Sequence, residues 1–284
     1  MSMFSDVLLT VDFDRTLTAP DSSIPQRNLD AIRYFIHNGG TFTVNTGRSL
    51  PMTAVFQDIV PVNAPLLLYN GSAAYDPVEG RIVFADPIQL DLWKTMGEVM
   101  ELFPDLLPEV QGLGAHYSLR EDAMWDAFSA YNQCAYGHAQ PGQDLGMFLK
   151  FSLYGQIRDV TVADLYSGTQ EEIARMDAAE AMLRRRYGAF CEVFRPAARI
   201  IDVHAKGVSK AKAARALQHQ LGKRLLVCVG DAGNDVAMLQ SADYAFCPAD
   251  GIIADQFPKV CPCAQGSVAE VILEKIPEIL GIKP

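Results

Sequence analysis

Two short apolar runs, one near each end of the chain, constrain the fold most strongly. Val7–Val11 and Leu225–Val229 are almost wholly apolar, and each ends at a polar segment, the first at Asp12 and the second at Gly230-Asp231. A strand that is apolar on both faces is typical of a parallel sheet covered by helices on each side. The sequence therefore predicts a parallel sheet to which both ends of the polypeptide contribute.

Strand and helix patterns alternate between residues 25 and 71. Pro25 suits a first helical turn and Gly39-Gly40 suits a helix end, with apolar residues at helical spacing between them. A strand from about residue 42, a helix over residues 51–58 and a third buried strand over residues 65–69 are expected next. This order predicts a β-α-β-α-β unit.

The same alternation returns after residue 208. Ser209 can cap a helix from Lys210 that Gly222 ends, and the second apolar run follows. A short helix over residues 234–240, a strand near residues 244–246 and a last helix over residues 268–276 complete the pattern. Alternating strands and helices predict an α/β fold with a doubly wound parallel sheet, in which ligands bind beyond the carboxyl ends of the strands.

The middle of the chain has a different pattern. Residues 93–103 look helical, residues 147–154 alternate like a half-exposed strand, and residues 178–187 form a charged amphipathic helix. We predict two domains: a core made of residues 1–84 and 196–284, and a separate α+β domain, residues 85–195, inserted into it.

The charge balance narrows the class of partner. The 284 residues include 24 Lys and Arg against 34 Asp and Glu, a formal net charge of −10 at pH 7. The average field repels nucleic acid and anionic membranes, so we expect neither as a partner. Six cysteines are too few for a disulfide scaffold, and the first residues lack a basic and apolar leader, so a cytoplasmic location is the expectation. A protein this acidic can bind a small anion only where a metal ion or a cluster of hydrogen-bond donors reverses the local field.

Two aspartates follow the first apolar run directly. In Asp12-Phe13-Asp14 the carboxylates are two positions apart, so on an extended chain they point to the same side and repel each other. A divalent cation removes that repulsion, and Mg²⁺ prefers such oxygen ligands. The motif alone also fits a solvent-exposed turn, or the metal-binding Asp-x-Asp pair of a nucleotide-sugar transferase.

Further polar motifs occupy other strand ends and helix starts. Residues 230–235, Gly-Asp-Ala-Gly-Asn-Asp, fit either a second half of a metal site or a glycine turn with a helix cap. Residues 46–48, Thr-Gly-Arg, offer a hydroxyl and backbone N–H groups that suit an anion. Lys210 lies in a first helical turn, where the helix dipole disfavours a cation unless an anion is near. A solvent-facing lysine is the alternative there.

Together these motifs resemble the four-motif signature of the haloacid dehalogenase-like (HAD) phosphohydrolases. The long insertion between the second and third motifs resembles the C2-capped, Cof-type branch. The matching motifs, in chain order, are Asp12-x-Asp14-x-Thr16, Thr46-Gly47-Arg48, Lys210 and Gly230-Asp231-x-x-Asn234-Asp235. The resemblance covers the core at both ends of the chain. It implies a Rossmann-like HAD core with an inserted C2-type cap, and a small phosphate ester as substrate.

The resemblance also implies a role for each acid. Asp12 would be the nucleophile that attacks phosphorus and forms an aspartyl-phosphate, and Asp14 the general acid and then the general base. Mg²⁺ would be held by Asp12, the backbone carbonyl of Asp14 and Asp231. Asn234 and Asp235 would support these ligands from behind.

The substrate phosphate is placed by the same resemblance. Thr46 and Lys210 would grip the phosphoryl oxygens, with Gly47 in the same binding set, and Lys210 would also assist catalysis. Arg48 and Asn70 would face the phosphate or the cap. The positive charge of metal and lysine is then concentrated where negative charge develops during transfer, which reconciles an acidic protein with an anionic substrate.

Three features depart from the family pattern. Arg15 stands where the family usually has glycine, Asn45 replaces a common alanine, and residues 247–250, Cys-Pro-Ala-Asp, replace the usual Gly-Asn-Ala stretch. Arg15 either alters the backbone beside Asp14 or places a cation over the cleft. None of the three removes a reactive group.

We therefore predict a Mg²⁺-dependent phosphatase that acts on small phosphomonoesters, either sugar phosphates or phosphorylated cofactors. Two other functions stay open: a phosphomutase on the same fold, and a non-catalytic sugar-phosphate-binding protein, which Arg15 slightly favours. The transferase is the weakest alternative because it leaves Lys210 and residues 230–235 without a role. His116, Lys150 and Arg195 are interpreted as surface or salt-bridge residues.

Overall fold

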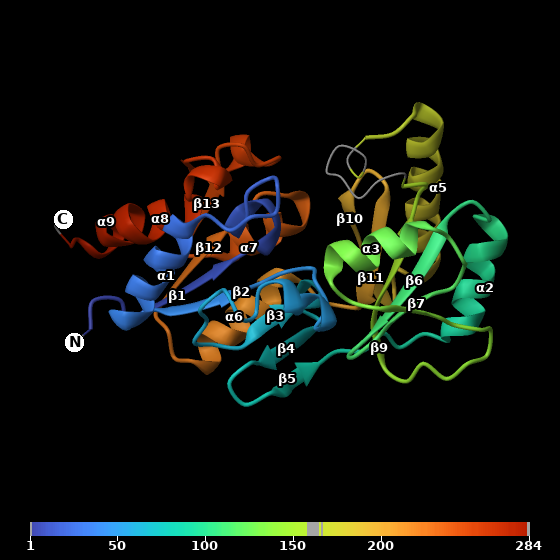
Figure 1. The fold of residues 1–284 in the computed structure, drawn as a ribbon, viewed down its shortest axis with the longest axis horizontal. Coiled ribbons are helices and arrows are strands. Elements are labelled where there is room, and N and C mark those ends of the chain that lie inside the picture. The colour runs from blue at the N-terminus through green and yellow to red at the C-terminus, as the bar shows by residue number, and fades with distance from the viewer. Residues whose placement is uncertain (1, 158–164, 166, 283–284) are drawn as a thin grey trace. The chain divides into compact units, whose positions relative to one another are not determined.

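The chain folds into two compact units in the computed structural model, which describes residues 2–157, 165 and 167–282 (Figure 1). One unit holds Met1–Gly47, Phe56–Phe84 and Ser209–Pro284, and the other holds Arg48–Val55 and Ala85–Val208. We call them the core unit and the inserted unit. The inserted unit thus interrupts the core unit, as the sequence pattern suggests.

A five-stranded parallel sheet forms the centre of the core unit, with the strand order β14-β13-β12-β1-β2. The two apolar runs become β1 and β12 and pair in parallel from Val7 opposite Leu225 to Val11 opposite Val229. All five residues of β1 are buried, as expected of a strand covered on both faces. The bounds of the five strands are β1 Val7–Val11, β2 Thr41–Val44, β12 Leu225–Val229, β13 Tyr244–Pro248 and β14 Lys259–Val260.

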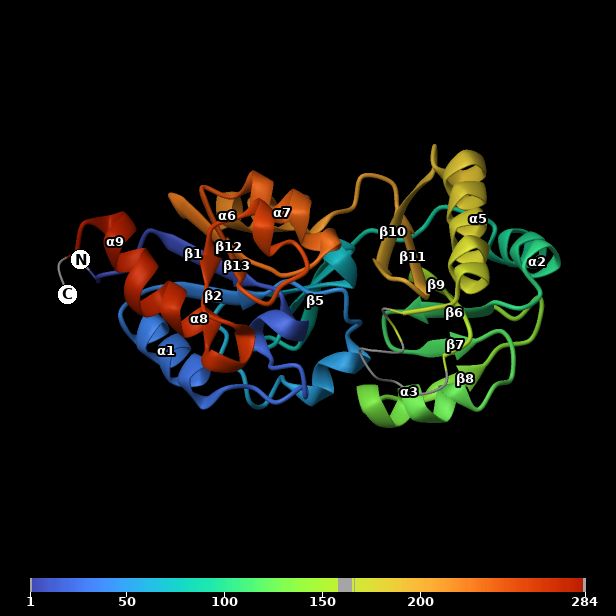
Figure 2. The same ribbon diagram turned by 90° about the horizontal axis from the view of Figure 1, so that it is seen from above.

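Helices cover both faces of this sheet (Figure 2): α1 and α8 lie on one side, α6 and α7 on the other. This confirms the predicted doubly wound α/β core. The helices are α1 Gln26–His37, α6 Lys210–Gln220, α7 Val236–Ser241, α8 Ser267–Glu270 and α9 Ile276–Leu280. Short helical turns lie at Phe13–Leu17, Pro51–Val55, Tyr69–Gly71, Gly233–Asp235, Ala254–Gln256, Cys263–Gln265 and Val271–Lys275.

The predicted third strand is buried but pairs differently from the first two. β3 (Leu66–Leu68) runs antiparallel to β4 (Ala73–Asp76), and β5 (Arg81–Ala85) completes a small three-stranded sheet. β3 meets the parallel sheet through a single bridge between Leu67 and Asn45. The hairpin arises because the Asn70-Gly71 turn, with φ of 54° and 94°, reverses the chain at once.

The helix expected over residues 51–58 is a short turn over Pro51–Val55. Two of its residues, Thr53 and Val55, are β-branched, which lowers helix propensity. The Thr53 hydroxyl donates to the Leu50 carbonyl at 2.7 Å, and such a side-chain bond competes with helix continuation.

A six-stranded sheet with the order β10-β11-β9-β6-β7-β8 organises the inserted unit. Its pairs are antiparallel except for β7 with β8. One face, including Val110, Phe151 and Val203, packs on helices α2 and α5. The elements are β6 Leu107–Gly112, β7 His116–Ser118, β8 Tyr136–His138, β9 Phe148–Tyr154, β10 Cys191–Ala197, β11 Ile200–Ala205, α2 Leu92–Leu102, α3 Met124–Asn132 and α5 Gln170–Tyr187.

The opposite face of this sheet is polar yet buried. The register sets Lys150 opposite Gln111 and His204, and Ser152 opposite Glu109 and Asp202. β9 is therefore buried along its whole length, and the expectation that it is half-exposed is wrong. Its alternation separates an apolar face from a polar face, and both are covered.

One boundary of the inserted unit and the start of one of its helices differ from the expected ones. The expected end at residue 195 lies inside β10, and β11 pairs with both β10 and β9, so the unit continues to Val208. Helix α5 begins at Gln170, well before residue 178, because Thr169 and Glu172 form a capping box. Among the described residues, no helix is both long and apolar enough to cross a membrane.

Candidate active site

Asp12 stands at the carboxyl end of β1, where ligands bind in a parallel sheet. Its backbone N–H donates to the carbonyl of Val229 at 2.9 Å, so the ladder between β1 and β12 continues one residue past the strand. The side chain is buried. This position brings Asp12 beside the segment that follows β12.

Lys210 is the first residue of α6 and is almost completely buried. The Ser209 side chain caps the helix by accepting from the Lys212 N–H at 3.1 Å. The Lys210 ammonium donates to Asp12 Oδ1 at 2.6 Å and to Asp235 Oδ1 at 2.7 Å. Burial disfavours its charge, but Asp12 and Asp235 outweigh burial and raise the pKa of Lys210. The lysine is therefore charged and faces two carboxylates.

Asp235 holds the turn after β12 together. Its Oδ2 accepts from the backbone N–H groups of Asp231 at 3.0 Å and Ala232 at 3.1 Å. A Cβ on Gly230 would lie 2.6 Å from the Asp235 side chain, so only glycine allows this close approach. The turn thereby points Asp231 and Asp235 toward the same place.

Asp231 uses only one of its two oxygens for hydrogen bonding. Oδ1 accepts from the Thr16 hydroxyl at 3.1 Å. Oδ2 is buried and accepts no hydrogen bond from the described part of the chain, and Arg15 Nε lies 3.9 Å from it. An acceptor left in this state is costly to bury, so Oδ2 is suited to a cation.

Three carboxylates therefore gather around one lysine. Burial and the charge of Asp235 raise the pKa of Asp231 to about 7. Burial also raises the pKa of Asp12, with the neighbouring acids adding to it, although Lys210 opposes the shift. The site holds more negative charge than its lysine balances.

The donor set fits a divalent cation. One carboxylate oxygen from each of Asp12, Asp231 and Asp235 lies within 4.8 Å of the other two. Mg²⁺ binds through hard oxygen ligands of this kind. The Asp14 carboxylate is not in this group, and the family resemblance placed only its backbone carbonyl at the metal.

Four other predicted residues of the core unit form a cradle nearby. Asn70 connects them: its N–H donates to the Thr46 carbonyl at 2.9 Å, and its Oδ1 accepts from Asn234 Nδ2 at 3.2 Å. A Cβ on Gly47 would lie 3.0 Å from Asn70 Oδ1, so a side chain at residue 47 would crowd the contact. Thr46 and Asn70 are buried. The second motif and the Asn70 turn thus meet the fourth motif.

Two other predicted site residues, Arg48 and Asp14, belong neither to the acidic cluster nor to this cradle. Arg48 belongs to the inserted unit, where its guanidinium donates to Asn132 Oδ1 at 3.3 Å and lies over the Tyr131 ring at 5.6 Å. Asp14 is half-buried, and it adjoins Arg15, whose backbone is left-handed with φ of 59°. The backbone beside Asp14 is therefore unusual, as the substitution of arginine for glycine suggested.

Asn45 has a function in the structure that the sequence did not reveal. Its amide donates to the Lys210 carbonyl at 3.0 Å, which ties the end of β2 to the first turn of α6. Alanine would make no such bond. The departure from the family pattern at this position therefore supports the placement of Lys210.

A buried line of polar side chains in the inserted unit was also missed. Ser49 Oγ lies 2.6 Å from His116 Nε2, and His116 Nδ1 lies 3.0 Å from Glu109 Oε1. Burial alone would raise the pKa of Glu109, but the hydrogen bond and charge of His116, together with Lys150, lower it. His116 is thus a buried residue that contacts Ser49 on one side and Glu109 on the other, rather than a surface residue. Ser49 itself is fully buried.

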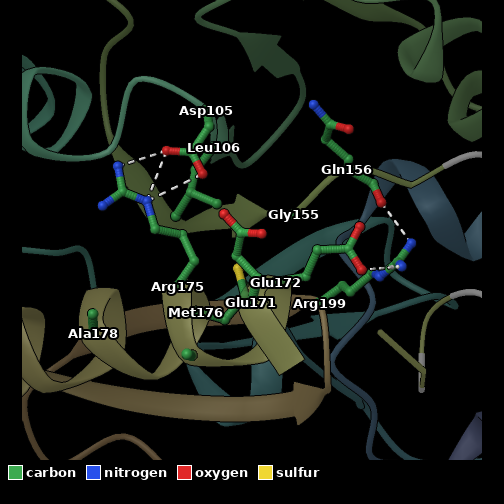
Figure 3. Close-up of a pocket in the computed structure, with 11 residues that line it drawn as sticks. Asp105, Leu106, Gly155, Gln156, Glu171, Glu172, Arg175, Met176, Ala178 and Arg199 are labelled. Atoms are coloured by element: carbon green, nitrogen blue, oxygen red, sulfur yellow. Dashed lines mark hydrogen bonds and ion pairs between the residues drawn. The ribbon is translucent and has the colours of Figure 1, made fainter. Parts of the chain in front are cut away.

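A cavity of about 640 Å³ lies within the inserted unit, at the start of α5 (Figure 3). Its arginines are paired: Arg175 binds Asp105 at 2.7 Å and Arg199 binds Glu172 at 2.8 Å. No motif pointed to this cavity. Since its cations already face acids, it offers little to an anionic ligand.

The family is decided by comparison with known proteins. A family model described as haloacid dehalogenase-like hydrolase matches residues 9–253 of the chain. The chain belongs to this family. The matched region contains every residue of the acidic cluster as well as the inserted unit. The resemblance drawn from the four motifs is confirmed, and the chain is a HAD-type hydrolase.

Solved structures share the fold of this HAD hydrolase at low identity. A haloacid dehalogenase-like hydrolase from Bacteroides thetaiotaomicron is 16% identical, with a TM-score of 0.76, over 95% of this chain and 98% of that one. A HAD subclass IIB sugar phosphatase is 18% identical, with a TM-score of 0.74, over 97% and 99%. These likenesses establish the fold of both units.

One curated relative matches over a shorter stretch. A phosphoglycolate phosphatase from Natronomonas pharaonis is 35% identical over 80 residues, which are 28% of this chain and 34% of that protein. The aligned part therefore spans about a third of that relative.

Proposed function

We propose that this HAD hydrolase is a Mg²⁺-dependent phosphatase that hydrolyses small phosphomonoesters through an aspartyl-phosphate on Asp12. The observation that carries the proposal is the buried contact of Asp12 with Lys210, beside Asp231 and Asp235. A carboxylate and a fixed ammonium lie there beside an oxygen-rich cluster that could hold a cation, at the carboxyl ends of β1 and β12. Two relatives named as phosphatases, one of them a sugar phosphatase, support the reaction class.

Asp12 is the nucleophile in this proposal. Lys210 holds its Oδ1 at 2.6 Å, which leaves the other oxygen to attack phosphorus. Attack forms the bond between Asp12 and phosphorus and breaks the bond from phosphorus to the ester oxygen. The rigid placement of Asp12 at a strand end lowers the entropic cost of reaching that geometry.

Asp14 moves the proton in both halves of the reaction. It first donates a proton to the departing ester oxygen, and it then takes a proton from the water that attacks the aspartyl-phosphate. The second step releases inorganic phosphate and restores the Asp12 carboxylate. Asp14 is half-buried, so its carboxyl group is able to meet solvent water.

The phosphate is bound by cationic and amide groups. Lys210 and the Thr46-Gly47 segment would contact the phosphoryl oxygens, while Asn70 and Asn234 hold that segment in place. Asp12, the backbone carbonyl of Asp14 and Asp231 would hold Mg²⁺, with Asn234 and Asp235 supporting them, and the ion would supply electrostatic stabilisation of the charge on the transferring group. These contacts strengthen as negative charge develops, which is the condition for catalysis.

The test is turnover by the purified protein with Mg²⁺. We expect release of inorganic phosphate from p-nitrophenyl phosphate and from a panel of sugar phosphates, pyridoxal phosphate and flavin mononucleotide. Asp12→Asn should lower kcat by at least about 10³-fold, because the amide is a poor nucleophile. Asp30→Asn, a change of the same kind on the exposed side of α1, is the matched control and should leave kcat unchanged. Unaltered turnover in Asp12→Asn would refute the assigned nucleophile.

The same panel separates the two other functions. A phosphomutase would convert a hexose monophosphate to its isomer in the presence of a bisphosphate activator and release no phosphate. A binding protein would retain a sugar phosphate in equilibrium dialysis without turnover. Either result would replace the phosphatase.

A further inference from the structure

Arg15 adopts a backbone conformation that side chains rarely take. Its φ is 59° and its ψ is 10°, in the left-handed region, and its N–H donates to the Thr18 hydroxyl at 3.0 Å. This region is strained for arginine, whereas glycine adopts it freely and asparagine tolerates it. Strain of this kind persists where the surrounding structure maintains it, and it is concentrated at functional sites. The strained residue lies between Asp14 and Thr16, both in the first motif.

The conformation brings the Arg15 side chain to Asp231. Arg15 Nε lies 3.9 Å from Asp231 Oδ2, beyond hydrogen-bonding distance. Both atoms are buried, and neither has a hydrogen-bond partner among the residues that the structure describes. Oδ1 of Asp231 already accepts from Thr16, so the guanidinium faces the one oxygen that stays available. Side-chain exposure is 24% for Arg15 and 2% for Asp231, so solvent screens this pair only in part.

The other cation of the site is committed to different carboxylates. The Lys210 ammonium donates to Asp12 and Asp235, at 2.6 Å and 2.7 Å. Arg15 is therefore a second cation of the site, and its Nε lies 3.9 Å from Asp231 Oδ2.

We propose that Arg15 weakens the binding of divalent cations at Asp231. Its guanidinium already balances the charge on Asp231 Oδ2, the oxygen that a cation would bind. The inference rests on the metal site of the proposed function. A divalent ion that binds at Oδ2 must approach the guanidinium, and like charges a few ångströms apart in a partly buried site repel strongly. Removing the charge should tighten Mg²⁺ binding by roughly tenfold, which corresponds to about 1.4 kcal/mol.

Three variants separate the charge of Arg15 from its backbone strain. Arg15→Gly removes both, Arg15→Asn removes the charge and tolerates the left-handed backbone, and Arg15→Lys keeps a cation at the same position. Arg33→Gln, an exposed change on α1 with the same loss of charge, is the matched control. The Kd for Mg²⁺ is measured by calorimetric titration of the full-length, metal-free protein, without any substrate. Circular dichroism verifies that each variant is folded.

We expect Arg15→Gly and Arg15→Asn to bind Mg²⁺ roughly tenfold more tightly than the parent protein, whereas Arg15→Lys and Arg33→Gln stay within about threefold of it. If the parent protein binds Mg²⁺ and the Gly and Asn variants bind it no more tightly, the inference fails while the proposed metal site stands. If folded parent protein and variants all show no binding of Mg²⁺, both the inference and the metal part of the proposed function fail. If only the Gly variant gains affinity, backbone strain and not charge is responsible, and the inference is again overturned.

Discussion

At the scale of single residues, the site depends on one buried lysine between two carboxylates. Lys210 is 1% exposed and Asp235 is fully buried, so neither charge can be left without its partner at low cost. The lysine also lies in the first turn of a helix, where the dipole opposes a cation. Both penalties are offset by Asp12 and Asp235, which makes the arrangement sensitive to any change at this position.

We predict that Lys210→Met destabilises the protein more at neutral than at acidic pH. At pH 7 the substitution leaves two buried carboxylates without their cation, and a loss of about 3–5 kcal/mol in unfolding free energy is expected. Urea denaturation measures it. At acidic pH the loss should shrink, because burial raises the pKa of Asp12 and a protonated Asp12 no longer requires a cation.

Lys212→Met, an exposed position on the same helix, is the control and should change stability little. Equal losses for the two lysines, or a loss at Lys210 that does not depend on pH, would contradict the ion-pair account. Phosphatase activity should disappear only in the Lys210 variant.

Most residues that the sequence named for the candidate site lie together in the structure, for a simple physical reason. Acids that follow apolar strands must gather at one edge of a parallel sheet, so the order of strands and motifs was enough to bring Asp12 and Asp231 together. For Arg15 the departure from glycine suggested either an altered backbone or a cation over the cleft, and the sequence could not choose between them, because a left-handed conformation at a residue other than glycine has no signature of its own. The participation of Asn45 was hidden as well, since its partner is a backbone carbonyl.

At the scale of elements, helix α6 carries the lysine into the site, and its cap decides where it begins. Ser209 accepts from the Lys212 N–H, so the first helical residue is Lys210. The apolar strands and this cap were predictable because each depends on local pattern. The pairing of β3 with β4 was not, since it depends on which neighbour a buried strand finds. The polar but buried face of the six-stranded sheet in the inserted unit was missed for the same reason.

We predict that Ser209→Ala lowers both stability and kcat. Loss of the N-cap should cost about 1 kcal/mol of unfolding free energy, and the frayed first turn should let the Lys210 ammonium leave Asp12. Steady-state kinetics should show a fall in kcat of roughly tenfold, and Ser209→Thr should restore most of it because threonine also caps.

Thr169→Ala is the matched control for this prediction. Thr169 caps α5 in the inserted unit through the same kind of bond, to the Glu172 N–H. It should lower stability similarly and leave kcat unchanged. Equal effects of the two caps on kcat would mean that activity follows stability alone and that the placement of α6 is not special.

At the scale of the whole molecule, the chain has a net charge of −10 and buries three clustered carboxylates, those of Asp12, Asp231 and Asp235, in its core unit. That arrangement has a predictable dependence on pH. Burial and Asp235 raise the pKa of Asp231 to about 7, from an ordinary value of 3.8. The folded protein therefore holds this proton more tightly than the unfolded chain does. The stabilisation that this proton gives the folded protein is complete below about pH 4 and is lost as the pH rises through about 7.

We predict that the metal-free protein loses thermal stability as the pH rises from 5 to 8 and that Mg²⁺ restores it at the upper end. Mg²⁺ takes the place of the lost proton, so at about 100 times its Kd it should raise the melting midpoint by roughly 5 °C at pH 8 and by much less at pH 5. Calorimetric scans with a chelator give the melting midpoint of the metal-free protein at each pH, and scans with Mg²⁺ give the rise in that midpoint. Asp231→Asn should flatten the pH dependence and abolish the Mg²⁺ effect, because the amide neither titrates nor carries charge. A Mg²⁺ effect of equal size at pH 5 and pH 8, or one that survives in Asp231→Asn, would show that the cation binds away from the acidic cluster at the end of β1 and β12.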